Sequence, residues 1–272
     1  MNPQGKVAII TGGATGIGLA AATEILQQGA HKVVLVGNIV RDGTEAARDL
    51  NREFGKNKAI FMEADVTKMD QFEDVFKETI QYFKRVDILF NNAGIMDDRH
   101  WEREVDLNVG GVVRGILLAF KYMGKDSKCG HPSGGPGGIV INNADVLGLQ
   151  AIPGAPIYST TKHAVIGAVK NFGDSYHSQR TGIRVVGLCP GVTQTNLVNY
   201  AADKQLTPEF GKATLDALSQ LPSQRTEIIG RAVLYLIRYA ASASVWIIED
   251  SDLFVADIPD RKNVSSFVVS FK

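Results

Sequence analysis

The amino-acid sequence predicts an α/β fold with a doubly wound parallel sheet and helices on both faces. Short β-branched runs alternate with longer amphipathic stretches along the chain, and this repeated order implies right-handed crossovers in one parallel sheet. Ligands of such sheets bind at the carboxyl ends of the strands, where the strand order reverses. The seven predicted strands are Val7–Thr11, Val33–Val36, Ala59–Met62, Ile88–Asn91, Ile139–Asn142, Val185–Leu188 and Val245–Ile248.

Length and composition favour a single globular domain over residues 1–272, because no Pro/Ser-rich or charged linker divides the chain. Lysine plus arginine and aspartate plus glutamate balance at 29 each, so no net field draws the chain to nucleic acid or to a membrane surface. The sequence leaves no room for a signal peptide before the first strand and has no membrane-spanning apolar run. We expect a cytoplasmic protein with small-molecule partners.

Three segments depart from the alternation of strands and helices. Residues 125–138 are polar and glycine-rich, which predicts a surface loop. Residues 196–225 form a long connection that is expected to supply a lid over the substrate. Residues 253–272 form a C-terminal tail that packs either on its own domain or on a neighbouring subunit. The two cysteines, Cys129 and Cys189, have neither metal-ligand nor disulfide spacing, and no metal site is expected.

A glycine-rich turn follows the first strand and opens a helix. Glycines there permit a tight turn and a close backbone approach to a pyrophosphate, and the helix N-terminus offers free amides. A plain loop is the alternative, but the position between strand and helix favours a dinucleotide. The predicted phosphate-binding residues are Gly12, Thr15, Gly16, Ile17 and Gly18.

The end of the second strand normally distinguishes NAD from NADP, because an acidic residue there binds the ribose 2′-hydroxyl and repels a 2′-phosphate. Gly37 occupies that position and Asn38, a predicted cofactor contact, follows it. NADP is therefore not excluded. Arg41 is either within reach of a phosphate or a solvated residue at a helix start.

Two further turns are expected beside the cofactor. After the third strand, Asp65 and Val66 offer an acceptor and an amide to an adenine edge, or else Asp65 caps the next helix. After the fourth strand, Asn92, Ala93 and Gly94 lie beside the cofactor channel or form an ordinary Asn-Gly turn.

Tyr158 and Lys162 lie four residues apart after Pro156, which predicts one face of a helix that begins near the proline. A tyrosine has an ordinary pKa of about 10, and a nearby cation is needed for it to act as a base at neutral pH. Lys162 and an oxidised nicotinamide ring can supply that positive charge. An ordinary helix face is the alternative.

Together these motifs resemble the short-chain dehydrogenase/reductase family, with its Rossmann fold, over nearly the whole chain. The residues that carry the resemblance are the glycine turn, Asn91–Gly94, Asn108, Tyr158, Lys162 and the run Pro190–Gly191–Val192–Thr193. Within the family, the chain is similar to insect-type alcohol dehydrogenases and 15-hydroxyprostaglandin dehydrogenases in 94–98, 134–139, 190–195 and 243–246.

The resemblance implies NAD as cofactor and a homodimer or homotetramer that oxidises a lipophilic secondary alcohol or reduces its ketone. Tyr158 then takes the alcohol proton, Lys162 activates it and binds the ribose, and Asn108 holds a relay water. Thr193 fixes the cofactor carboxamide, and Pro190, Gly191 and Val192 line the same edge.

The expected catalytic serine is absent. The family places it three residues before Gly148 and thirteen before Tyr158, and Asp145 stands there. An ionised Asp145 opposes a phenolate by about 4 kcal/mol at 4 Å and an effective dielectric near 20, whereas a neutral Asp145 donates a hydrogen bond as serine does.

Asp145 leaves three readings open: a slow dehydrogenase, a non-catalytic protein that binds dinucleotide, or an engineered variant.

Overall fold

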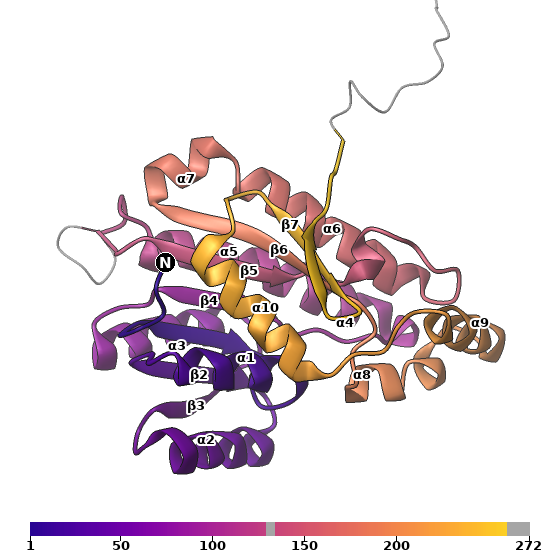
Figure 1. Ribbon diagram of the computed structural model, residues 1–272, viewed down its shortest axis with the longest axis horizontal. Coiled ribbons are helices and arrows are strands. Elements are labelled where there is room, and N and C mark those ends of the chain that lie inside the picture. The colour runs from indigo at the N-terminus through magenta and orange to yellow at the C-terminus, as the bar shows by residue number, and fades with distance from the viewer. Residues whose placement is uncertain (129–133, 260–272) are drawn as a thin grey trace, which may run out of the picture.

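The computed structural model describes residues 1–128 and 134–259, which form a central sheet flanked by helices (Figure 1). The sheet has eight strands in the order β3-β2-β1-β4-β5-β6-β7-β8. All pairings up to β7 are parallel, which confirms the predicted doubly wound α/β class. The strands are β1 (Val7–Thr11), β2 (Lys32–Gly37), β3 (Ala59–Glu63), β4 (Ile88–Asn91), β5 (Gly138–Asn143), β6 (Ile183–Pro190), β7 (Val245–Glu249) and β8 (Asp252–Val255).

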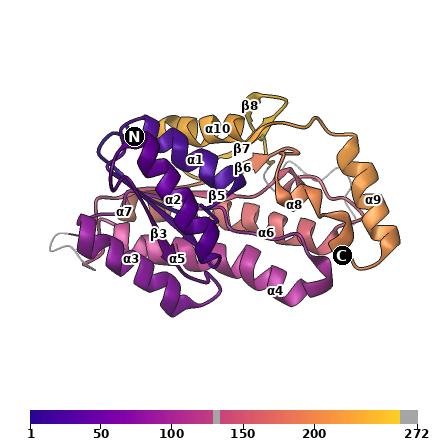
Figure 2. The ribbon, with the colours of Figure 1, turned by 90° about the horizontal axis from the view of Figure 1, so that it is seen from below.

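Helices cover both faces of the sheet. One face packs against α1, α2 and α10 through one apolar cluster, and the other against α3, α5 and α6 through a second cluster (Figure 2). The helices are α1 (Gly16–Gln27), α2 (Val40–Phe54), α3 (Met69–Phe83), α4 (Trp101–Val105), α5 (Val112–Met123), α6 (Pro156–Phe172), α7 (Ser175–Thr181), α8 (Asn196–Asn199), α9 (Pro208–Ser219) and α10 (Thr226–Tyr239). Within residues 1–128 and 134–259, no helix has the length and apolarity needed to cross a bilayer.

The central strands are apolar without alternation because helices bury both of their faces. Every residue of β1 and residues 32–36 of β2 are buried. This double burial explains why short continuous β-branched runs marked the strands correctly in the sequence.

The prediction of seven strands was wrong by one. Glu249 and Asp252 pair across a two-residue turn, and β8 runs antiparallel to β7. Asp250 and Ser251 have φ values of 47° and 71°, as a tight hairpin that matches strand twist requires. Asp-Ser lacks the glycine that usually signals this turn, so residues 253–255 were assigned to the tail. The tail residues 260–272 lie outside the described residues.

Of the unusual segments, residues 196–225 have partly regular structure, whereas the described part of the glycine-rich loop is held by backbone hydrogen bonds. Residues 196–225 contain α8, a 3₁₀ turn at Ala202–Lys204 and α9, and a bridge between Thr193 and Gln224 joins the two ends of the segment. In the glycine-rich loop, Gly135 donates to the carbonyl of Gly124 at 2.7 Å. Residues 129–133 of that loop, including Cys129, lie outside the described residues.

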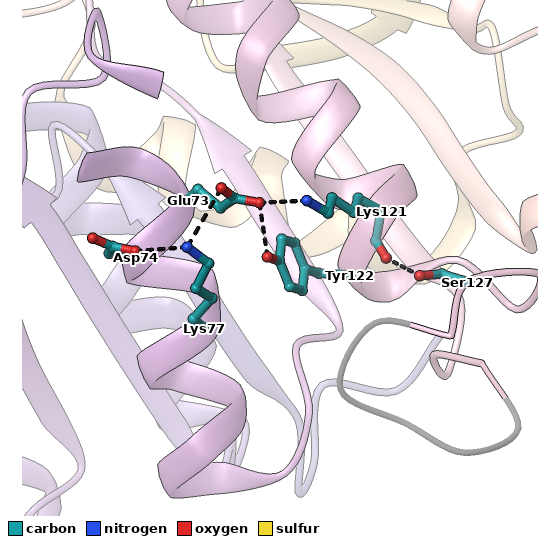
Figure 3. A network of polar contacts seen from close by, with 6 residues as sticks. All are labelled: Glu73, Asp74, Lys77, Lys121, Tyr122 and Ser127. Carbon is teal, nitrogen blue, oxygen red and sulfur yellow. Dashed lines mark hydrogen bonds and ion pairs between the residues drawn. The ribbon is translucent and has the colours of Figure 1, made fainter. Parts of the chain in front are cut away.

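A polar network ties α3 to α5 on one face of the sheet (Figure 3). The Glu73 carboxylate accepts hydrogen bonds from Lys121 Nζ at 2.6 Å and from the Tyr122 hydroxyl at 2.8 Å. Lys77, one turn along α3, lies 3.4 Å from the other carboxylate oxygen. The hydrogen bond from Lys121, followed by that from Tyr122, lowers the pKa of Glu73 to about 2.

We expect Glu73→Gln to lower the free energy of unfolding at pH 7 by up to about 1 kcal/mol, because the pair is partly solvent-exposed. Because the pKa of Glu73 is lower in the folded protein than in the unfolded chain, ionised Glu73 stabilises the fold at pH values above its ordinary pKa. This stabilisation is lost as the pH falls toward about 2. Denaturant unfolding between pH 7 and 3 measures this. The exposed Glu78→Gln on α3 is the control, and an equal loss in both variants at every pH contradicts the role of the network.

Candidate active site

A cleft lies at the carboxyl ends of the central strands, where β1 is flanked by β2 on one side and β4 on the other. It comprises a cavity of about 460 Å³ and an adjoining deeper pocket of about 70 Å³. Both are lined by Ile17, Asn92, Gly94, Met96, Asn143, Thr195 and Leu197. The deeper pocket also reaches Asp145, Tyr158 and Lys162.

The glycine positions of the turn after β1 leave little or no room for a Cβ. A Cβ on Gly18 would lie 2.2 Å from the Gly12 carbonyl oxygen, and one on Gly12 would lie 3.1 Å from Ala93 Cα. Gly12 and Gly16 adopt φ values of 61° and 53°, which favour glycine. Thr15 precedes α1 without a side-chain cap, so the first amides of α1 stay available to an anion in the larger cavity.

Thr11, at the end of β1, organises the turn after β4. Its hydroxyl accepts hydrogen bonds from the amides of Asn92 and Ala93, each at 3.0 Å. The Asn92 side-chain amide donates back to the carbonyls of Thr11 at 3.1 Å and Gly12 at 3.2 Å. The structure therefore brings the predicted residues Asn92, Ala93 and Gly94 to the cavity wall. The sequence analysis did not predict this role of Thr11, although a hydroxyl residue at the end of a strand indicates it.

Tyr158 and Lys162 lie on α6, which begins at Pro156 as predicted. Both side chains are buried, at 2% and 4% exposure, and Lys162 Nζ lies 5.3 Å from the centre of the Tyr158 ring. Lys162 Nζ donates to the Asn143 carbonyl at 2.9 Å. The phenol and the ammonium group thus share one pocket, as their spacing on the helix required.

Asp145 lies directly beside the phenol. The Tyr158 hydroxyl donates to Asp145 Oδ2 at 2.8 Å, while Asp145 Oδ1 accepts from the Leu147 amide at 3.0 Å. Asp145 has φ 56° and ψ 153°, a conformation that is unfavourable for a residue with a side chain. With this backbone conformation the carboxylate lies within hydrogen-bond distance of the Tyr158 hydroxyl.

The three groups shift one another's protonation. Burial raises the pKa of Tyr158 well above its ordinary value, and the charge of Asp145 raises it further. Burial also raises the pKa of Asp145, against the opposing effect of Lys162. Burial lowers the pKa of Lys162, and the charge of Asp145 offsets only part of this effect. In the protein alone, the phenol therefore keeps its proton and donates it in a hydrogen bond to Asp145.

Asn108 lies in a π-helical turn at Asp106–Gly111 (η2) between α4 and α5, buried and outside the described linings of the two cavities. Its side-chain oxygen accepts from the Ile95 amide at 2.9 Å, and its nitrogen donates to the Ile95 carbonyl at 2.8 Å. The same nitrogen donates to Thr161 Oγ1 at 3.1 Å, on α6. Asn108 therefore links η2 to α6 and to the segment after β4.

The remaining predicted residues divide between the cleft and the rim of the sheet. Pro190, Gly191, Val192 and Thr193 line the deeper pocket, and the buried Thr193 hydroxyl donates to the Gly191 carbonyl at 2.8 Å. Asn38, Asp65 and Val66 follow β2 and β3, outside the described linings of these two cavities. Asp65 Oδ1 accepts a hydrogen bond from the Thr67 amide at 2.9 Å. Lys68 directly precedes α3, so Asp65 does not occupy the capping position of that helix.

Asn143 was missed by sequence reasoning. It lines both cavities, its carbonyl accepts from Lys162, and its side-chain nitrogen donates to Asn92 Oδ1 at 3.1 Å. The signal was an amide residue at the end of β5, next to one at the end of β4.

Comparison with known proteins identifies the family of this chain. The sequence profile of the family described as short chain dehydrogenase matches residues 6–206. The chain belongs to this family. The predicted family membership is thereby confirmed, and so is the prediction of an oxidoreductase of the short-chain dehydrogenase type.

Individual relatives are similar to this short chain dehydrogenase over most of their length. 15-Hydroxyprostaglandin dehydrogenase (NAD(+)) of Homo sapiens is 34% identical over 198 residues, which are 73% of this chain and 72% of the relative. Alcohol dehydrogenase 1 of Ceratitis cosyra is 30% identical over 247 residues, 91% and 93% of the two chains. The crystal structure of levodione reductase superposes with a TM-score of 0.75 at 29% identity and covers 90% of this chain and 96% of that one.

We expect Gly18→Ala in this short chain dehydrogenase to weaken dinucleotide binding at least about tenfold and to lower Tm by roughly 5–10 °C, because the new Cβ collides with the Gly12 carbonyl. Calorimetric titration with NAD and thermal unfolding measure the two effects. Gly167→Ala is the matched control, since nothing lies within 4 Å of its added Cβ. Equal behaviour of the two variants contradicts the close packing at Gly18.

Proposed function

We propose that this protein is an NAD(P)-dependent dehydrogenase that interconverts a lipophilic secondary alcohol and its ketone. The observation that carries the proposal is the hydrogen bond of 2.8 Å between the Tyr158 hydroxyl and Asp145, in a pocket that Lys162 shares and that adjoins the glycine turn. A group that moves a proton therefore lies next to a surface that accommodates a dinucleotide.

The residues present fit a nicotinamide dinucleotide. The turn at Gly12–Gly18 packs backbone closely against backbone, because a Cβ on Gly18 would collide with the Gly12 carbonyl. Thr15, Gly16 and Ile17, at the start of α1, line the larger cavity. Thr193 and Gly94 lie at its deeper end. When bound, the oxidised cofactor supplies a hydride acceptor. Of the cofactors that carry this group, NAD is supported by the human relative, whose name includes it.

The chain itself supplies a path for the alcohol proton. The alcohol proton moves to the Tyr158 oxygen as the phenol proton moves to Asp145 Oδ2, 2.8 Å away. The hydride would leave the carbon that bears this hydroxyl group, and the bound oxidised cofactor would supply its acceptor. The alcohol thus loses one proton from oxygen and one hydride from carbon and becomes the ketone. This transfer avoids a phenolate beside a carboxylate, a pair of charges that repel by about 4 kcal/mol at 4 Å. The raised pKa of Asp145 makes it a better proton acceptor.

The substrate side of the deeper pocket is apolar. Its walls include Met96, Val146, Leu147, Leu197, Val198 and Leu218. Leu197, Val198 and Leu218 come from segment 196–225, which we propose as the substrate lid. An apolar wall beside one proton-transferring group favours an alcohol with a hydrophobic substituent over a highly polar one.

Substitution of Asp145 tests the proposal. We expect Asp145→Asn to lower kcat by about 100-fold or more, because asparagine cannot take the proton, while NAD affinity changes little. Asp145→Ser restores the hydroxyl of the family pattern and retains turnover. Calorimetry with NAD and NADP and hydride transfer with a panel of secondary alcohols give both quantities.

The same variants distinguish a dehydrogenase from a non-catalytic protein that binds dinucleotide. The raised pKa of Tyr158 favours the second function, because it makes the phenol a poor base. In that case the native protein binds NAD without turnover, and only Asp145→Ser transfers hydride. A rise in kcat in Asp145→Asn shows instead that the carboxylate inhibits, and contradicts its role as acceptor.

Gly37 offers a test of cofactor choice. A Cβ there meets only Phe61 at 3.8 Å, so an acidic side chain fits without displacing backbone. We expect Gly37→Asp to raise the preference for NAD over NADP at least about tenfold, because the carboxylate repels a 2′-phosphate. The ratio of the two Kd values measures this, with Gly37→Asn as the uncharged control. An equal change in both variants contradicts the electrostatic explanation.

A further inference from the structure

Two buried carboxyl groups lie behind the catalytic helix, outside the site described above. Asp98 lies in the 3₁₀ turn Asp98–His100 and Glu104 lies in α4, and both are 0% exposed. Neither was among the predicted site residues. A carboxyl group is rarely this buried unless it has hydrogen-bond partners or a specific task.

Asp98 holds the first turn of α6. Its two oxygens accept from the amides of Ile157 at 2.9 Å and Tyr158 at 3.0 Å. Ala155, which precedes the helix, has no side-chain cap. Asp98 therefore provides from 59 residues away the capping that a local Ser or Asp usually provides, and its negative charge is favourable at a helix N-terminus. One of the two amides belongs to Tyr158.

Glu104 faces Asp98 and has incomplete hydrogen bonding. Its Oε1 accepts from the Asp97 amide at 3.3 Å. Its buried Oε2 receives no hydrogen bond from an amide, ammonium or hydroxyl group of the described residues, so the Asp98 carboxyl group is its polar neighbour. Burial, followed by the charge of Asp98 and their shared hydrogen bond, raises the pKa of Glu104 to about 8. At neutral pH the Glu104 carboxyl group therefore keeps its proton.

We propose that Asp98 and Glu104 share one proton and thereby hold the N-terminus of α6, and with it Tyr158, in its working position. Glu104 is a positioning residue in this arrangement, because it does not touch the reacting atoms. The inference rests on the proposed function for its effect on turnover, whereas the shared proton itself does not depend on turnover.

The groups around Glu104 define what happens when it loses the proton. Asp97 and Asp98 face it from the segment before α4, and Tyr158 and Lys162 feel its charge from α6. Arg99 and His100 lie 3.6 and 3.2 Å from Asp97 rather than from Glu104. Ionisation would thus place a second carboxylate charge against Asp98 and raise the pKa of Tyr158.

The test uses Glu104→Gln, which stays neutral at every pH, with the exposed Glu102→Gln on α4 as control. Because the folded protein holds the Glu104 proton more tightly than the unfolded chain does, raising the pH through about 8 removes stability from native protein and control. We expect the Tm of Glu104→Gln minus that of the control to grow by roughly 5 °C or more between pH 5 and 8 and then to stay constant. A difference that does not change with pH overturns the proposal.

The pH profile of kcat tests the positioning role. We expect the ratio of kcat in Glu104→Gln to that in the control to rise several-fold between pH 7 and 9.5. A pH-dependent Tm difference with a flat kcat ratio overturns the link to Tyr158. Absence of turnover in native protein and in Asp145→Ser contradicts the proposed function, while the Tm profile still supports or overturns the shared proton.

A second variant covers the case in which Glu104→Gln does not fold. Asp98→Asn keeps an acceptor oxygen for the α6 amides but removes the charge that faces Glu104. We expect the pH range of the Tm decrease to move to lower pH. An unchanged range overturns the proposal.

Discussion

Close backbone packing between the end of β1 and the start of α1 is the constraint on which the rest of this structure depends. The Gly12 carbonyl occupies the place of a Gly18 side chain, so α1 is drawn against the sheet and its N-terminus opens into the cleft. Thr11 and Asn92 extend the same contact to β4. From this fixed edge, the segments after β4, β5 and β6 face a common cavity.

Charge is distributed unusually around the phenol. Asp145 lies on its hydroxyl side and the Asp98–Glu104 pair lies behind its backbone, whereas Lys162 supplies the nearby ammonium group. All of these groups are shielded from water, so each proton affects its neighbours strongly. Several acidic groups therefore lie near one lysine, and the charge around the phenol depends on which of these groups carries a proton.

The sequence predicted those parts of the site whose conformation depends on neighbouring residues in the chain. The glycine turn, the helix with Tyr158 and Lys162, and the strands buried on both faces follow from spacing and burial, and family spacing placed Asp145 beside the phenol. In the sequence, Asp98 and Glu104 resemble surface charges in a stretch rich in acidic and basic residues. Their role could not be predicted, because it depends on contacts with α6, which is distant in sequence. Strand β8 was missed because its turn adopts positive φ without glycine. The single domain, oligomeric state and cytoplasmic location stay predictions.

The π-helical turn η2 has a consequence for how the chain tolerates insertions and deletions. A π turn accommodates one residue more than a regular helical turn, and Asn108 lies within it. Deleting one residue there would restore a regular helix, but would rotate the following residues by about 100° about the helix axis. The contact between Asn108 and Ile95 would then be lost. The more regular backbone would thus lose this contact, so the number of residues in this stretch is constrained as well as the identity of Asn108.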